Sequence, residues 1–263
     1  MISSGLLLWL ISGDCALARI APKVGIERIL VDLERLGKAE RQKGKQLFLS
    51  DYDWDDIAAL RPVLPKACLF VRLDPLHDGS RAQVEQAIAL DVDGIMLPYF
   101  HDADTVLRFA ELVAGRAPVV PLVETLGAVR NLPALLRSGV IEEFHVGLND
   151  LALDMGLHSL QQLWGHPILD EVAAAAADAG IPFGIGGVTD PRLSGLPINP
   201  VFVIAEQRRL QSTRALLGRS FRLAFGEQPD AAAVLAATDA IRQAYRSAVP
   251  AAEPKPSAPQ PAL

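Results

Sequence analysis

The chain has 263 residues, half of them apolar, and a formal net charge of -6 at neutral pH. This length suits an α/β barrel, which forms one domain around one large apolar core. The net negative charge offers no basic stripe for a phosphate backbone, so we expect no nucleic-acid partner. The two cysteines, Cys15 and Cys68, lack the spacing of a disulfide framework or a thiolate zinc site, which fits a reducing cytoplasm.

An apolar stretch near the N-terminus, residues 5–11, superficially resembles an export signal. It lacks the basic residues and the small-residue cleavage site of such a signal, and it is too short to span a bilayer. A helix-like stretch and a second strand-like run follow directly. We therefore expect a buried first strand, and we expect no membrane partner.

Short apolar runs of strand length alternate with longer amphipathic or alanine-rich segments, which is typical of βα units around a parallel sheet. The expected strands cover residues 6–11, 28–32, 67–71, 94–97, 119–123, 143–146, 182–185 and 201–204. The expected helices cover residues 14–24, 55–60, 80–90, 103–114, 127–138, 168–179 and 207–217. Eight parallel strands favour an α/β fold of the TIM (β/α)8 barrel type. The competing open sheet is disfavoured because no GxGxxG follows the first strand and no Walker lysine loop is present.

The C-terminal part of the chain predicts one additional amphipathic helix, residues 230–248. We expect a barrel domain in residues 1–226, followed by this helix in residues 227–249, packed on its own barrel or swapped with a neighbouring subunit. Residues 250–263 are rich in Pro and Ala without the periodicity of a core, which predicts a disordered tail.

Five charged residues stand where apolar strand runs end: Asp32, Glu34, Arg72, Glu124 and Asp150. The carboxyl ends of barrel strands form one mouth, where active sites lie, so we expect these side chains to converge. Converging carboxylates repel each other unless a cation lies between them, and hard oxygen ligands suit Mg²⁺ or Mn²⁺. We expect Glu124 and Asp150 to hold the ion, and Arg72 to hold a carboxylate or enolate oxygen.

These residues also have purely structural interpretations. Glu124 would balance the dipole of the helix that follows it, and Asp150 would cap the next short helix. The acidic pair after the second strand would form ion pairs with the basic residues at positions 35, 38 and 41.

Five short stretches occur in order along the chain: Val31-Asp32-Leu33-Glu34, Val71-Arg72-Leu73-Asp74-Pro75-Leu76, Ile95-Met96-Leu97-Pro98, Leu122-Val123-Glu124-Thr125 and Val146-Gly147-Leu148-Asn149-Asp150-Leu151. Together they resemble the HpcH/HpaI aldolase and citrate lyase β-subunit family, and the glutamate and aspartate have that family's spacing. The resemblance runs from about residue 6 to residue 221.

The resemblance implies a class II, metal-dependent carbon–carbon lyase that acts on pyruvate, oxaloacetate or a related 2-oxo acid. In this family a divalent ion and an arginine hold the substrate, and the ion stabilises the enolate. Glu124 and Asp150 match the metal ligands, and Arg72 matches the enolate-stabilising arginine. Asp32 and Glu34 match the acidic pair that supports the arginine and the metal-bound water.

The same resemblance implies where the substrate carboxylate binds and how the protein assembles. The carboxylate is received by backbone amides, here those of Gly147, Leu148 and Asn149. Members commonly exchange a late helix between subunits, so the resemblance implies a homo-oligomer, either a trimer or a hexamer.

One departure from the family pattern concerns proton transfer. The pyruvate aldolases of the family have a histidine directly after the Asp-x-Glu element, whereas this chain has Arg35. The alternatives are metal-bound water, Lys38, His77 after the third strand and His101 after the fourth. We favour His77 among them, although a loop histidine at a barrel mouth also suits a substrate contact or an exposed position.

The segment after the acidic pair, residues 35–43, is basic, whereas citrate lyase-type members have a further acidic residue there and act on coenzyme A thioesters. This segment suggests an offshoot whose aldehyde or acyl partner differs from those of both branches. The leading hypothesis is reversible aldol addition or cleavage between a pyruvate-type enolate and an aldehyde. Two alternatives stay open. The first is a citrate lyase-type acyl-CoA lyase or thioesterase, and the second is a non-catalytic barrel that binds a metal or a small molecule.

Overall fold

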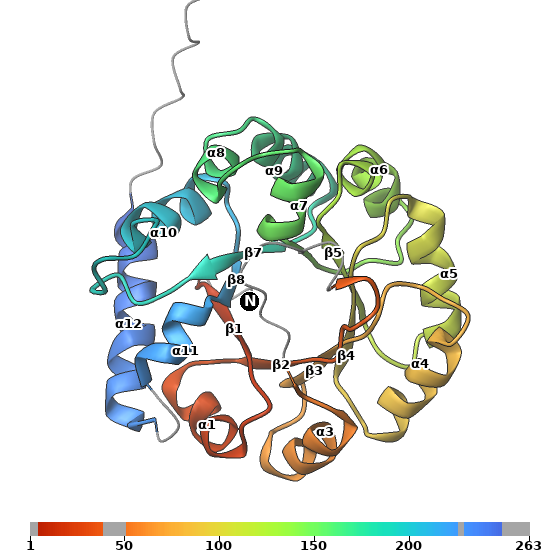
Figure 1. Cartoon of the computed structure of the whole chain (residues 1–263), viewed down its shortest axis with the longest axis horizontal. Helices are drawn as coiled ribbons and strands as arrows, with labels where there is room; N and C mark the ends of the chain where they lie inside the picture. The colour runs from red at the N-terminus through yellow and green to blue at the C-terminus, as the bar shows by residue number, and fades with distance from the viewer. Residues whose placement is uncertain (1–4, 39–50, 226–228, 249–263) are drawn as a thin grey trace, which may run out of the picture.

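The computed structural model describes residues 5–38, 51–225 and 229–248. Within these residues, eight parallel strands close into a barrel in sequence order, and the first strand pairs with both the second and the last. Helices form a ring outside the barrel (Figure 1). The predicted TIM (β/α)8 fold is confirmed.

The strands are short and are followed by helices of variable length. The strands are β1 (Leu7–Ile11), β2 (Arg28–Asp32), β3 (Leu69–Arg72), β4 (Gly94–Leu97), β5 (Val119–Val123), β6 (Phe144–Val146), β7 (Phe183–Val188) and β8 (Arg214–Leu217). The helices and 3₁₀ turns are α1 (Cys15–Ile20), η1 (Ala21–Val24), α3 (Trp54–Leu60), η2 (Arg61–Val63), α4 (Ser80–Ala89), α5 (Ala103–Val113), α6 (Leu126–Arg137), α7 (Leu148–Asp154), α8 (Leu160–Trp164), α9 (Ile168–Ala179), α10 (Pro200–Arg209), α11 (Arg219–Phe225) and α12 (Ala231–Ser247).

Strand side chains alternate between the barrel interior and the surrounding helices, and the interior is filled. Its apolar cluster consists of Trp9, Leu30, Phe70, Met96, Val120 and Leu122. Two glycines make room for rings inside the barrel. A Cβ at Gly94 would lie 2.1 Å from Cε1 of Phe70, and a Cβ at Gly184 would lie 2.3 Å from Cε1 of His145. The packed interior leaves the carboxyl ends of the strands as the place for a polar site.

The amino-terminal end of the barrel carries a charged network. Glu143, just before β6, accepts hydrogen bonds from Arg28 at the start of β2 and from Nε of Arg214 at the start of β8, the latter at 2.9 Å. Burial raises the pKa of the Glu143 carboxyl, but the two guanidinium groups outweigh burial and hold its pKa below the ordinary value. At this end of a barrel, such a network serves stability.

The prediction for the eighth strand was wrong. Residues 201–204 lie in helix α10, and the predicted helix at 207–217 contains the actual strand β8. Asn199 caps α10 by accepting a hydrogen bond from the Val201 amide at 2.9 Å, and Pro200 occupies the first helical position. This start signal outweighs the β-branched run, because Val203 and Ile204 pack inward while Val201 faces solvent.

Helix α12 packs against η1 and α10 of its own chain (Figure 1). Its buried side includes Thr238, whose hydroxyl donates to the Val24 carbonyl at 2.5 Å, and Tyr245, whose hydroxyl donates to the Ser212 carbonyl at 2.8 Å. The predicted tail, residues 250–263, lies outside the described residues. No helix in the described ranges is both long and apolar enough to cross a bilayer.

Candidate active site

Asp32 and Arg72 form a bidentate pair at the carboxyl ends of β2 and β3. The two residues are register partners in the parallel ladder, so both side chains point into the same mouth. Arg72 donates from Nε to Oδ1 of Asp32 at 2.8 Å and from Nη2 to Oδ2 at 2.6 Å. Burial raises the pKa of Asp32, but Arg72 and then Lys38 outweigh burial and hold its pKa well below the ordinary range. Asp32 is therefore a fixed anion that orients the guanidinium.

Lys38 adds a second cation to this pair. Its Nζ lies 2.8 Å from Oδ2 of Asp32 and 3.3 Å from Oε2 of Glu34, and the residue is only 5% exposed. Glu34 Oε2 also lies 3.4 Å from Nε of Arg72. We call these four residues, Asp32, Glu34, Lys38 and Arg72, the charged cluster. From the sequence, Lys38 was expected either as an alternative proton carrier or as one of the possible ion-pair partners of Asp32 and Glu34, and the structure shows the ion pairs.

The loop that carries Lys38 is held in place by Asp74, a residue to which the sequence assigned no role. Oδ1 of Asp74 accepts hydrogen bonds from the amides of Arg35 at 2.6 Å and Leu36 at 2.8 Å. Gln83 donates to the other carboxylate oxygen at 2.8 Å. Arg35 itself is exposed, and its Nη2 donates to the Tyr52 carbonyl at 2.7 Å. The residue that replaces the family histidine therefore points to the outer loop.

Glu124 and Asp150 bring two buried carboxylates to the same mouth, at 4% and 5% exposure. Glu124 follows β5 directly, and its Oε1 accepts a hydrogen bond from the Tyr99 amide at 2.9 Å. Burial raises the pKa of Glu124, and the negative charges of Glu34 and Asp150 raise it further. A cation between the two carboxylates would oppose both effects and favour the ionised form.

Tyr99 is a second site residue that sequence analysis did not single out. Its φ of +47° is a left-handed conformation that is uncommon for a residue with a side chain, and it points the amide at Glu124. Tyr99 also lines a hollow of about 200 Å³ together with Asp150, Leu153 and Asp154. This hollow reaches Asp150, one member of the carboxylate pair.

Gly147 allows Glu124 to occupy its position. A Cβ on Gly147 would lie 2.3 Å from Oε2 of Glu124, which is closer than real contacts allow. The Gly147 amide donates to the Val123 carbonyl at 3.0 Å, so it belongs to the barrel ladder. Helix α7 begins directly afterwards, and the first-turn amides of Leu148 and Asn149 have no acceptor within the helix.

The carboxylate pair fits a hard divalent cation. Mg²⁺ is commonly held by one or two carboxylates and completes its octahedral shell with water and substrate oxygens. In residues 5–38, 51–225 and 229–248, no group of three or more His, Cys, Asp or Glu side chains could hold a metal. The mouth therefore suits an ion whose remaining ligands come from water and substrate, and it does not suit a closed structural zinc site.

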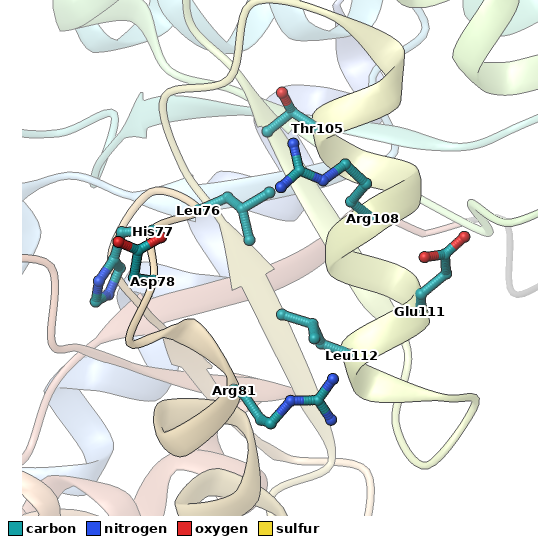
Figure 2. Close-up of a pocket in the computed structure, with 8 residues that line it drawn as sticks. All are labelled: Leu76, His77, Asp78, Arg81, Thr105, Arg108, Glu111 and Leu112. Atoms are coloured by element: carbon teal, nitrogen blue, oxygen red, sulfur yellow. The ribbon is translucent and has the colours of Figure 1, made fainter.

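The two loop histidines lie apart from the charged cluster. Nδ1 of His77 accepts from the Gly79 amide at 3.1 Å, and its Nε2 lies 3.4 Å from Oε1 of Gln83. His77 borders a separate hollow of about 440 Å³ between α4 and α5 (Figure 2). His101 packs edge-on against Tyr99 with ring centroids 5.2 Å apart. Within the described residues, no hydrogen bond or ion pair joins either imidazole to the cluster, so the geometry does not favour His77 as the proton carrier.

The chain is a TIM barrel whose buried charged side chains gather at the carboxyl ends of its strands. The HpcH/HpaI aldolase/citrate lyase family matches residues 6–185, and the chain belongs to this family. The family assignment from the five sequence stretches is thereby confirmed.

Solved structures of the same family share the fold. A family protein from Burkholderia cenocepacia J2315 is 16% identical, with a TM-score of 0.63 over 84% of this chain and 90% of the other. The protein CitE from Mycobacterium tuberculosis, in complex with magnesium and pyruvate, is 16% identical, with a TM-score of 0.61 over 92% and 91%. The citrate lyase beta subunit from M. tuberculosis, complexed with oxaloacetate and magnesium, is 18% identical, with a TM-score of 0.60 over 92% and 98%. No curated protein matches the chain.

Proposed function

We propose that the protein is a metal-dependent carbon–carbon lyase, an aldolase that joins or cleaves a pyruvate-type enolate and an aldehyde. One observation carries the proposal: the buried Glu124–Asp150 pair and the Arg72 fork meet at the carboxyl ends of β5, β6 and β3. Magnesium accompanies pyruvate in one structural relative and oxaloacetate in another, which supports a 2-oxo acid as the ligand class.

Each site residue has a definite part in this proposal. Glu124 and Asp150 would hold Mg²⁺ or Mn²⁺, and the ion when bound supplies Lewis-acid stabilisation of enolate charge. Arg72 uses Nε and Nη2 on Asp32, so its Nη1 would be the nitrogen that donates to an oxygen of the 2-oxo acid. Leu148 and Asn149 offer their first-turn amides to the substrate carboxylate, whereas the Gly147 amide is taken by Val123.

The acceptor chemistry is tested by product analysis. We expect the protein with Mg²⁺ or Mn²⁺ to convert pyruvate and a short aldehyde into a 4-hydroxy-2-oxo acid, observed by proton NMR across a panel of aldehydes. Parallel reactions contain acetyl-CoA with oxaloacetate. Formation of citryl-CoA, which keeps the thioester, is followed by mass spectrometry, and release of the thiol by thioester hydrolysis is followed with a chromogenic reagent. Thioester turnover without any aldol product would replace the aldolase by the citrate lyase-type alternative, and no turnover with either set would leave the non-catalytic barrel.

A further inference from the structure

Lys38 stands out because it is a buried cation in a mouth dominated by carboxylates. Four buried acidic side chains meet there, Asp32, Glu34, Glu124 and Asp150, against two cations in the described part of the chain, Arg72 and Lys38. These described groups carry two negative charges in excess when all are ionised. A divalent ion would cancel that excess.

The contacts of Lys38 are ion pairs. Its Nζ lies 2.8 Å from Asp32 Oδ2 and 3.3 Å from Glu34 Oε2. Arg72 Nη2 contacts the same Asp32 oxygen at 2.6 Å. Lys38 therefore shares the acidic pair with Arg72 and contributes a fixed charge.

Lys38 acts through Glu34 on Glu124 and Asp150, the two carboxylates that we call the metal pair. Glu34 is one of the two carboxylates whose negative charge acts on Glu124, and Lys38 is the ion-pair partner of Glu34. The positive charge of Lys38 thus offsets part of the negative charge that Glu34 exerts on Glu124. A positive charge near the mouth weakens the binding of a cation there and strengthens the binding of an anion.

We propose that Lys38 is a positioning residue that sets the charge of the mouth, so that the metal-loaded site accepts an anionic 2-oxo acid. This inference rests on the proposed function. Without the ammonium, the loaded site is one unit more negative, which weakens the binding of an anion and strengthens the binding of a metal cation. A merely structural role predicts something different, because a distorted mouth would bind both ligands more weakly.

The test measures two affinities that do not depend on turnover. Mn²⁺ binding is followed by water-proton relaxation, and oxalate binding to the Mn²⁺-loaded protein is followed by calorimetry, at mildly alkaline pH where carboxylates are ionised. The variants are Lys38→Met, Lys38→Arg and the control Lys66→Met. Lys66 is an exposed lysine just before β3, at the opposite end of the barrel, and it pairs with Asp91.

We expect Lys38→Met to bind oxalate about tenfold or more weakly while it binds Mn²⁺ as tightly as wild type or more tightly. Lys38→Arg restores oxalate binding, and Lys66→Met changes neither affinity. If circular dichroism shows that Lys38→Met is unfolded, Lys38→Gln takes its place, because it removes the charge and keeps a hydrogen-bond donor.

Three results would overturn the inference. They are unchanged oxalate binding in Lys38→Met, a parallel loss of Mn²⁺ and oxalate, or wild-type protein that binds no Mn²⁺. Deuterium exchange into pyruvate by wild type separates this question from the proposed function. Wild type that binds Mn²⁺ and oxalate but exchanges no proton contradicts the aldolase, while the comparison of variants still decides the role of Lys38.

Discussion

The close approach of Gly147 to Glu124 makes one backbone position critical for the metal pair. A methyl group at Gly147 would lie 2.3 Å from Oε2 and 2.8 Å from Cβ of Glu124. We expect Gly147→Ala to displace the carboxylate and to weaken Mn²⁺ binding by about 10- to 100-fold, the range found for perturbed ligand support. Gly165→Ala is the matched control, because a Cβ at Gly165 meets open space. Equal Mn²⁺ affinities in the two variants would contradict this arrangement.

The raised pKa of Glu124 gives a pH dependence with a definite sign. A carboxyl whose pKa is raised by folding favours the folded state most below its ordinary pKa, and this contribution is lost as the pH rises through the raised value. Metal-free wild type should therefore lose stability relative to Glu124→Gln between mildly acidic and mildly alkaline pH. Added Mg²⁺ should reverse the loss. Thermal unfolding of both proteins checks this, and a pH-independent difference would refute it.

The sequence identified the charged residues that end apolar strand runs, because a buried parallel strand is recognisable and its last residue faces the mouth. This reasoning found Asp32, Arg72 and Glu124, which the structure places at the ends of β2, β3 and β5. It gave the ion pair of Lys38 with Asp32 only as one alternative, and it assigned no role to Asp74. The hydrogen bond between Asp74 and the Arg35 amide joins residues that are 39 positions apart, so no local pattern predicts it.

At the scale of elements, strand β8 shows why one barrel strand was missed. Arg214–Leu217 is only four residues long and begins with an arginine that pairs with Glu143 inside the barrel. The apolar run at this point, residues 215–217, has only three residues, whereas residues 201–204 form a longer run within α10. Seven strands were found because both of their faces are buried, and the eighth was missed because a charged network replaces part of its apolar pattern.

The network of Glu143, Arg28 and Arg214 should stabilise the fold without contributing to ligand binding at the mouth. We expect Glu143→Ala to lower the free energy of unfolding by about 3 kcal/mol, because two partly buried guanidinium groups lose their anion. The pKa of Glu143 is lowered on folding, so its contribution is present above the ordinary glutamate pKa and disappears as the pH falls. Urea denaturation measures the change.

Two controls accompany this variant. Glu85→Ala removes the carboxylate of an exposed pair with Arg116 and should leave the unfolding transition unchanged. Mn²⁺ affinity of folded Glu143→Ala should match wild type, because the network lies at the end of the barrel away from the mouth. Weak Mn²⁺ binding by the folded variant would show that the two ends are coupled.

For the whole molecule, we propose that the protein assembles into a trimer or hexamer. Large apolar side chains remain exposed on α10, α11 and α12, which lie near one another in Figure 1: Val201, Phe202, Leu223 and Leu235. The exposed fraction reaches 67% at Leu223, which is high for a large apolar side chain. Light scattering coupled to gel filtration should give three or six times the mass of the chain, and a monomer would refute the proposal.

The most direct test of the central claim is proton NMR of pyruvate in D₂O with purified protein, with and without Mg²⁺ or Mn²⁺. We expect metal-dependent loss of the methyl signal as deuterium enters through the enolate. Glu124→Gln should abolish this loss, whereas Glu111→Gln, which changes an exposed residue on α5, should retain it. No exchange with any metal, or unchanged exchange in Glu124→Gln, would contradict the claim that the Glu124–Asp150 pair holds the ion that stabilises the enolate.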